Sequence, residues 1–159
     1  MMRFRPANRK DTTGLAELIL EVEQFYDNST AVQPLAERRR QVAEALFGSP
    51  PMAHALVAED EDGDLVGFAV YSFLWPAAGS SHSLFVKELF VRSALRRHGI
   101  GTRLMDILRA LAAMRPGCTR VEWMTDRNNP GARSFYQSLG CTESDDKIVY
   151  RLDAGPEKG

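Results

Sequence analysis

The stretch from Leu84 to Leu111 constrains the fold of this chain more than any other. An apolar, strand-like run, Leu84–Val91, is followed by the basic, glycine-containing stretch Arg96–Gly101 and then by leucines spaced along one face of a helix. The first turn of a helix has backbone N–H groups without partners and the positive end of the helix dipole, so it binds anions. Glycines let an anion approach the backbone, and arginines add charged donors. The stretch predicts a strand, a phosphate-binding loop and a helix, with a solvated basic turn as the alternative.

The loop lacks both common nucleotide signatures. It has no GxxxxGK[ST] sequence, and Thr102 and Arg103 follow Gly101 where GxGxxG would continue toward a third glycine. What remains is Arg96-x-x-Gly99-x-Gly101, which is suggestive by itself and gains weight from its place between a strand and a helix.

The rest of the chain predicts one mixed α/β domain, residues 1–153, with a short flexible tail, 154–159. A length of 159 residues with 44% hydrophobic content suits a single packed domain. Helices are expected after the caps Asp11–Thr13, over Leu35–Phe47, after the glycine loop, and after Asn129, where Pro130 suits the first helical position. The expected strands are Met2–Pro6, His54–Glu59, Leu65–Trp75, Leu84–Val91, Thr119–Thr125 and Lys147–Leu152.

Charge and cysteine content exclude several classes of function. Twenty basic residues against twenty-one acidic ones give a net charge of −1, which argues against nucleic-acid or membrane partners held by bulk charge. Cys118 and Cys141 indicate reduced thiols of a cytoplasmic protein, with a disulfide as the alternative. The amino terminus has no signal-peptide pattern, and no apolar run reaches membrane-spanning length. The three histidines have no metal-ligand spacing, so no metal is expected.

Two motifs give the chain a specific resemblance. The loop resembles the pyrophosphate-binding (R/Q)xxGx(G/A) loop of the GNAT superfamily of N-acetyltransferases, and Asn129-x-x-Ala132-x-x-Phe135-Tyr136-x-x-x-Gly140 resembles that family's NxxAxxFYxxxGF element. The runs LFGSPPMAHALVAED, VGFAVYSF and KELFV are most similar to the diamine (spermidine/spermine) N-acetyltransferase branch. The resemblance implies acetyl-CoA as cosubstrate, a mostly antiparallel sheet of about six to seven strands with about four helices, and a homodimer.

The resemblance also implies which residues hold the cofactor. The end of the fourth strand would pair with the pantetheine arm through its backbone, and the glycine loop would hold the pyrophosphate with its amides. The residues concerned are Leu89, Phe90, Val91, Arg96, Arg97, His98, Gly99, Ile100, Gly101, Thr102, Asn129, Ala132 and Tyr136.

Two residues are candidates for the chemistry. Tyr136, placed in relatives near the cofactor sulfur, could protonate the leaving thiolate, since a phenol has a pKa near 10; a core tyrosine is the alternative. Glu88 could take the proton of the amine, directly or through water. The Leu89 amide would receive the oxyanion, as in relatives. Because neighbouring strand residues face opposite ways, Lys87 and Glu88 can share the acceptor side only if a bulge redirects one.

The acceptor is less defined than the cofactor. Glu21, Glu23 and Asp27, with Glu88, could line an acidic groove, or the first three could belong to a solvated helix face. Lys87 stands where the diamine branch usually has an acid, so amines that carry a carboxylate are expected to be better substrates than polyamines. The prediction is N-acetylation of a small primary amine by direct attack. The alternatives are an acyl-CoA-binding protein with decayed catalysis and a protein or peptide N-acetyltransferase.

Overall fold

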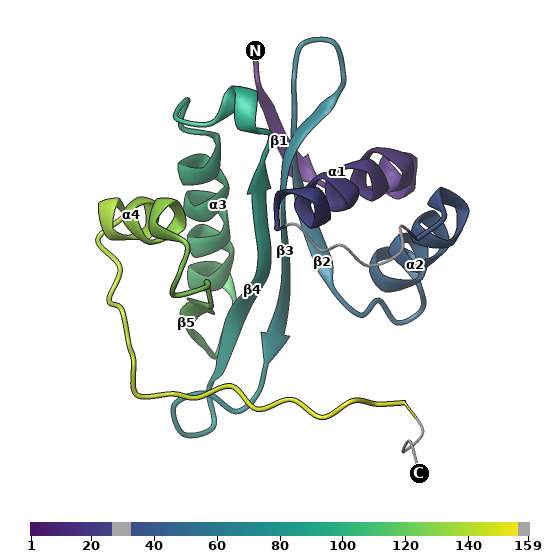
Figure 1. Cartoon of the computed structure of the whole chain (residues 1–159). Helices are drawn as coiled ribbons and strands as arrows, with labels where there is room; N and C mark the ends of the chain where they lie inside the picture. The colour runs from purple at the N-terminus through teal and green to yellow at the C-terminus, as the bar shows by residue number, and fades with distance from the viewer. Residues whose placement is uncertain (27–32, 156–159) are drawn as a thin grey trace. The chain divides into compact units, whose positions relative to one another are not determined.

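The computed structural model describes residues 1–26 and 33–155 and separates the chain into two compact units, Met1–Met124 and Thr125–Gly159 (Figure 1). The first unit contains a single sheet with three long helices and two short 3₁₀ turns. Its strands are β1 (Arg3–Pro6), β2 (His54–Glu59), β3 (Leu65–Leu74), β4 (His82–Val91) and β5 (Cys118–Trp123). Its helices are α1 (Thr12–Phe25), α2 (Leu35–Phe47) and α3 (Ile100–Met114), with the 3₁₀ turns η1 (Arg9–Asp11) and η2 (Ser93–Leu95). The second unit contains α4 (Pro130–Ser138).

The sheet has the strand order β1-β2-β3-β4-β5, antiparallel throughout except for the parallel pair β4–β5. The mixed α/β class is therefore confirmed, but the expected six to seven strands are not: the described residues form five. The strand predicted at Lys147–Leu152 is wrong, because these residues have no strand conformation. Their β-branched and aromatic side chains favour a strand, but a strand also needs a neighbour for its backbone hydrogen bonds, and this segment pairs with none of the described strands.

The helices cover both faces of the sheet. Figure 1 shows α1 and α2 on one side of the strands and α3 on the other. On the α1 side, Leu15 and Leu18 pack with Phe68 and Phe90 in a buried cluster. On the other side, Leu104 and Leu108 of α3 are fully buried, as the leucine spacing predicts. These two apolar layers hold β3 and β4 in the middle of the unit.

A partly buried ion-pair network joins β1 to the start of α1. Arg5 donates two hydrogen bonds to Asp11, at 2.7 and 2.9 Å, and also bonds Glu59 on β2. Asp11 occupies the N-cap position of α1, as expected, but its side chain makes no cap hydrogen bond there. It accepts instead from the Asn8 amide at 2.7 Å, so its carboxylate fixes the entry of the helix through β1.

Candidate active site

The glycine loop leads into the first turn of α3 through two left-handed backbone positions. Arg97 has φ 65° and Gly99 has φ 80°, a region that costs a side-chain-bearing residue energy and that is found at functional sites. A Cβ built on Gly99 meets no atom within 4 Å. The first bond of the helix runs from Arg103 N to Gly99 O at 2.9 Å, so the amides of Ile100, Gly101 and Thr102 precede the helical ladder. The loop therefore combines open space with unpaired donors, which fits a phosphate group.

Arg96 and His98 hold the loop in shape. Arg96 donates from Nε to the Val91 carbonyl at 2.9 Å, and its guanidinium lies over the rings of Phe25 and Phe90 at 4.7 and 5.4 Å. His98 Nδ1 lies 2.9 Å from the carbonyl oxygen of Arg96, which is an acceptor, so this nitrogen carries the proton. The Arg96 guanidinium thus contributes first to the loop's own structure.

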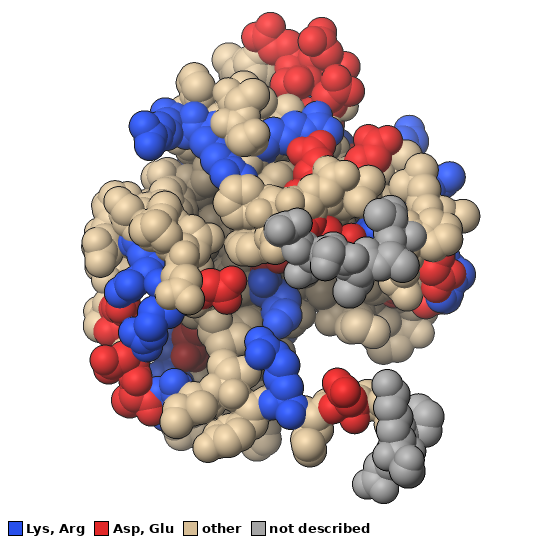
Figure 2. All heavy atoms as spheres, viewed as in Figure 1, with Lys and Arg blue, Asp and Glu red and all other residues tan. Residues whose placement is uncertain are grey.

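Two other arginines provide exposed positive charge at this loop. The side chains of Arg97 and Arg103 are exposed, and among the described residues neither has an ion pair. Figure 2 shows Lys and Arg side chains gathered over the loop before α3. Sequence reasoning did not assign Arg103 to the site, although its position four residues after Gly99, in the first turn of the helix, was a usable signal.

Beyond its pairing with β5, strand β4 has a backbone edge that pairs with no other strand among the described residues. The parallel ladder with β5 covers only His82–Val86, whereas the antiparallel ladder with β3 continues to Val91. The Arg92 amide donates to the Val66 carbonyl, so the backbone groups of Arg92 point toward β3. Because successive residues of a strand direct their backbone groups to opposite edges, those of Val91 and Leu89 point away from β3, toward the open side. An extended chain could bond to Leu89 there as an additional strand would, while the Val91 carbonyl already accepts from Arg96.

A β-bulge lies at Lys87, where the sequence analysis gave a bulge as the condition for Lys87 and Glu88 to share the acceptor side. Val70 pairs with Glu88 and Tyr71 pairs with Val86, so Lys87 is an extra residue on β4. The bulge shifts the alternation of side chains by one. Glu88 consequently shares the face of Val70, which packs on the α1 side of the sheet.

Glu88 is partly buried, and this burial raises the pKa of its carboxyl group above the ordinary value. A hydrogen bond from the Leu89 backbone and the charge of Lys87 act in the opposite direction. The Lys87 side chain is exposed and directly precedes Glu88 in the chain, so its charge acts on the Glu88 carboxyl group. A carboxylate with a raised pKa is a stronger base, which suits proton removal from an amine.

The acidic residues of α1 are occupied by arginines. Glu21 accepts from Arg92 Nε at 3.0 Å, and Glu23 makes two 2.8 Å bonds with Arg38. Asp27 lies outside the described residues. The two described carboxylates therefore stabilise the packing of α1, and Glu88 is the candidate acid of the site without an arginine partner among the described residues.

The second unit contains the other predicted motif. Asn129 Oδ1 accepts from the Ala132 amide at 3.1 Å and Pro130 begins the helix, which confirms the predicted N-cap. Gly140, with φ 76°, follows the end of the helix, also as predicted. Within α4 the ring of Tyr136 lies 5.2 Å from that of Phe135. The catalytic role of Tyr136 and the cofactor contacts of Asn129 and Ala132 stay predictions.

Comparison with known proteins identifies the family of the chain. The sequence profile described as "Acetyltransferase (GNAT) family" matches residues 17–141, which include both motifs. The chain belongs to this family and is a GNAT-family N-acetyltransferase, with acetyl-CoA as its acetyl donor. Within residues 1–26 and 33–155, no group of His, Cys, Asp or Glu side chains could hold a metal ion, and no helix is long and apolar enough to cross a membrane.

Individual relatives extend the comparison. The chain is 24% identical over 154 residues to the N-acetyltransferase YhfO of Bacillus subtilis (strain 168), covering 96% of this chain and 97% of that protein. It is 30% identical over 84 residues to the L-ornithine N5-acetyltransferase NATA1 of Arabidopsis thaliana, covering 52% of this chain and 36% of that protein. The structure of an integron cassette protein of V. cholerae matches with a TM-score of 0.80 and 27% identity, covering 96% of this chain and 93% of the other.

Proposed function

We propose that the protein transfers the acetyl group of acetyl-CoA to a primary amine of a small molecule that also carries a carboxylate. The observation that carries the proposal is the arrangement on β4. An open backbone edge at Leu89 lies between the partly buried Glu88, which follows the bulge, and the anion-binding start of α3. These three features follow one another along a single strand and loop. Their order is the one that the parts of acetyl-CoA would require: the thioester near Glu88, the pantetheine arm along Leu89 and the pyrophosphate at the start of α3.

The donor would lie along this edge. Its pantetheine arm would bond to the backbone of Leu89 in the manner of an additional strand, beside Phe90 and Val91. Its pyrophosphate would accept from the amides of Ile100, Gly101 and Thr102, with the exposed Arg97 and Arg103 supplying charge. The space at Gly99, where a Cβ would meet nothing, supports this placement.

The reaction would proceed by direct attack. Glu88 takes a proton from the ammonium, and the amine nitrogen then bonds to the thioester carbonyl carbon. The Leu89 amide hydrogen-bonds Glu88, and protonation of that carboxylate weakens the bond, which frees the amide as the oxyanion forms. The C–S bond breaks, and the CoA thiolate takes a proton from Tyr136. The nitrogen, now bonded to the acetyl carbon, gives up its second proton, which restores the Tyr136 phenol, and Glu88 returns its proton to solvent. The products are the N-acetylated amine and CoA.

The acceptor follows from the charges beside Glu88. The diamine branch, which the sequence resembles, usually has two acids where Lys87 and Glu88 stand, and the exposed Lys87 ammonium lies near Glu88. With Glu21 and Glu23 bound to arginines, Glu88 is the one candidate carboxylate among the described residues that remains to attract a polycation. Lys87 could instead bind the carboxylate of an amino acid. NATA1, described as an L-ornithine N5-acetyltransferase, is a relative whose acceptor has both groups.

A thiol-release assay with acetyl-CoA tests this proposal. Ornithine, lysine and thialysine are expected to react faster than spermidine, and Lys87→Glu should shift preference toward spermidine. Two unit charges 4 Å apart in water interact by about 1 kcal/mol, so removing the repulsion should improve spermidine recognition by roughly fivefold or more. Lys10→Glu makes the same charge change on η1 and should leave the ratio unaltered.

Three outcomes would contradict the proposal. Efficient turnover of spermidine by the wild type would show that Lys87 does not face the acceptor. Acetyl-CoA binding without turnover of any amine would indicate a non-catalytic acyl-CoA-binding protein. Turnover restricted to peptides would indicate a protein or peptide N-acetyltransferase.

We also propose that the protein is a homodimer. Large apolar side chains in the segment after α4 are exposed, among them Ile148, Tyr150 and Leu152, and a second copy could cover them. Light scattering at micromolar concentration should give twice the monomer mass of 17.8 kDa, and a monomer mass would reject the assembly.

A further inference from the structure

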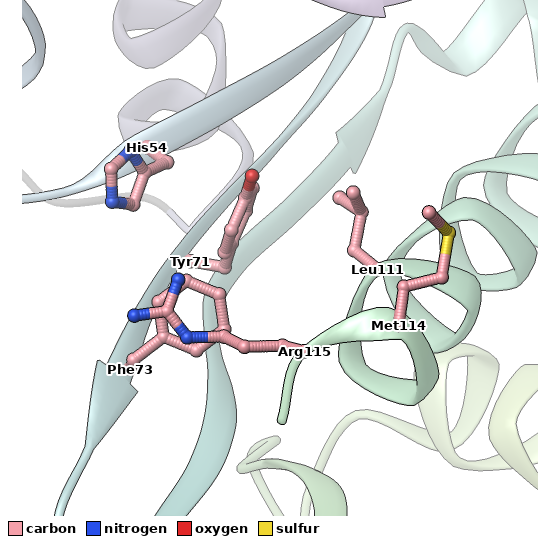
Figure 3. A pocket seen from close by; sticks show the side chains of 6 residues that line it. All are labelled: His54, Tyr71, Phe73, Leu111, Met114 and Arg115. Carbon is pink, nitrogen blue, oxygen red and sulfur yellow. The ribbon is translucent and has the colours of Figure 1, made fainter. Parts of the chain in front are cut away.

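A pocket lies within the first unit, at the end of α3 farther from the glycine loop. It has a volume of about 290 Å³ and is lined by His54, Tyr71, Phe73, Leu111, Met114 and Arg115 (Figure 3). The lining residues of α3 begin at Leu111, and the helix rise from Ile100 to Leu111 separates this pocket from the anion-binding turn by about 16 Å. Tyr71 and Phe73 also point to the opposite face of β3 from Val70, the partner of Glu88. The pocket is therefore separate from the proposed acetylation site.

The walls of this pocket are aromatic and aliphatic. The ring centroids of Tyr71 and Phe73 lie 5.9 Å apart, and the His54 ring lies 5.4 Å from that of Tyr71. Leu111 and Met114 face them from α3, and Figure 3 shows Tyr71 standing between His54 and Leu111. Flat, apolar walls of this kind suit a ring.

One charged side chain is fixed at the edge of the pocket. The Arg115 guanidinium lies 3.7 Å above the Phe73 ring, and its Nε donates to His82 Nε2 at 3.2 Å. Figure 3 shows Arg115 reaching across the face of Phe73. The two terminal nitrogens of Arg115 have no hydrogen-bond partner among the residues that the structure describes, and no acidic residue lines the pocket. The guanidinium is thus held in one orientation, with its two-donor end available to a carboxylate.

We propose that this pocket binds a small, flat carboxylic acid of one or two rings. The ring would lie against Tyr71, Leu111 and Met114, and the carboxylate would accept two hydrogen bonds from Arg115. Phe73 and His82 act as positioning residues, because they hold the guanidinium and leave its terminal nitrogens unused. The volume is at the lower end of the range for small-molecule sites, which excludes a ligand as large as CoA.

Calorimetric titration with 2-naphthoate tests the site, with the neutral 2-naphthamide as the matched ligand. Naphthoate should bind, and naphthamide should bind at least tenfold more weakly. Arg115→Gln should weaken naphthoate binding at least tenfold. Arg109→Gln, an exposed arginine of the same helix, should leave it unchanged. Met114→Trp should block the pocket without unfolding the protein, since the Met114 side chain is 80% exposed.

The proposal is overturned by any of four results. Naphthoate does not bind the wild type, or it binds Arg115→Gln and Met114→Trp as tightly as the wild type. Naphthoate is displaced by saturating CoA, in which case it occupies the cofactor site. Light scattering shows a dimer that Met114→Trp dissociates, in which case this face is an interface between two copies.

Discussion

Replacing Gly99 by alanine separates the conformational role of this glycine from its role in binding an anion. Gly99 has φ 80°, and an added Cβ would meet no atom within 4 Å, so the substitution causes no steric clash within the protein. The left-handed conformation alone costs a residue with a Cβ about 1–2 kcal/mol. For a protein of this size, that corresponds to a melting temperature lower by about 2–8 °C.

Gly63 provides a matched control. It lies in the turn between β2 and β3, has φ 87°, and its Cβ would also meet nothing within 4 Å. Gly63→Ala should therefore lose about the same stability as Gly99→Ala. The two variants differ in that only Gly99 borders the amides proposed to hold the pyrophosphate.

The response to CoA should distinguish the two variants. At a concentration of 100 times Kd, a ligand that binds only the native state stabilises it by about 2.7 kcal/mol. If the Cβ at position 99 weakens binding 100-fold, the same concentration stabilises Gly99→Ala by only about 0.4 kcal/mol. Thermal denaturation with and without CoA, together with calorimetric Kd values, measures both effects. Equal CoA stabilisation of Gly99→Ala and Gly63→Ala would refute the phosphate-binding role of the loop.

Three further predictions concern single side chains. Tyr136→Phe should lower kcat by about 100-fold or more with little change in the KM for acetyl-CoA, whereas Tyr150→Phe should not; unchanged turnover would make Tyr136 a packing residue. Because burial raises the pKa of Glu88, kcat/KM should fall as the pH decreases through a value above the ordinary glutamate pKa. Glu88→Gln should abolish this decrease at acid pH. If the decrease persists in Glu88→Gln, Glu88 is not the base. Burial alone would raise the pKa of Asp11, but hydrogen bonds from Arg5 and the Asn8 amide lower it below the ordinary 3.8. The stabilisation that the Asp11 carboxylate provides is therefore complete above pH 3.8 and is lost as the pH falls through the folded-state pKa. Urea denaturation should find Asp11→Asn less stable at pH 7 and less sensitive to acid below pH 4; equal acid sensitivity would assign the effect to other groups.

The features that the sequence predicted well depend on residues close together in the chain. The Asn129 cap, the proline that follows it and the glycine that ends α4 all act within one or two helical turns. The strand bounds His54–Glu59 and the helix bounds Leu35–Phe47 agree with the structure to the residue. Local caps and periodicity are enough to specify such elements.

The features that sequence reasoning missed depend on partners far away in the chain. Lys147–Leu152 has the composition of a strand, yet strand formation requires a neighbour that composition cannot identify. Glu21 was predicted to line the substrate groove, and only the structure shows that its carboxylate is bound by Arg92, 71 residues later. The requirement for a bulge at Lys87 and Glu88 was deduced from strand alternation, but its position between Val70 and Tyr71 comes from the register of β3.

The sequence by itself identified the family, and through the resemblance of its short motifs to that family it predicted a phosphate-binding loop and the residues for acetyl transfer. Only the tertiary structure decided which of the charged candidate residues have no ion-pair partner among the described residues, and where a second ligand could bind. Arg115 and His82 are 33 residues apart, and neither belongs to a motif. Their contact exists because α3 packs against β3 and β4, and packing between distant segments depends on the whole chain and not on any local pattern.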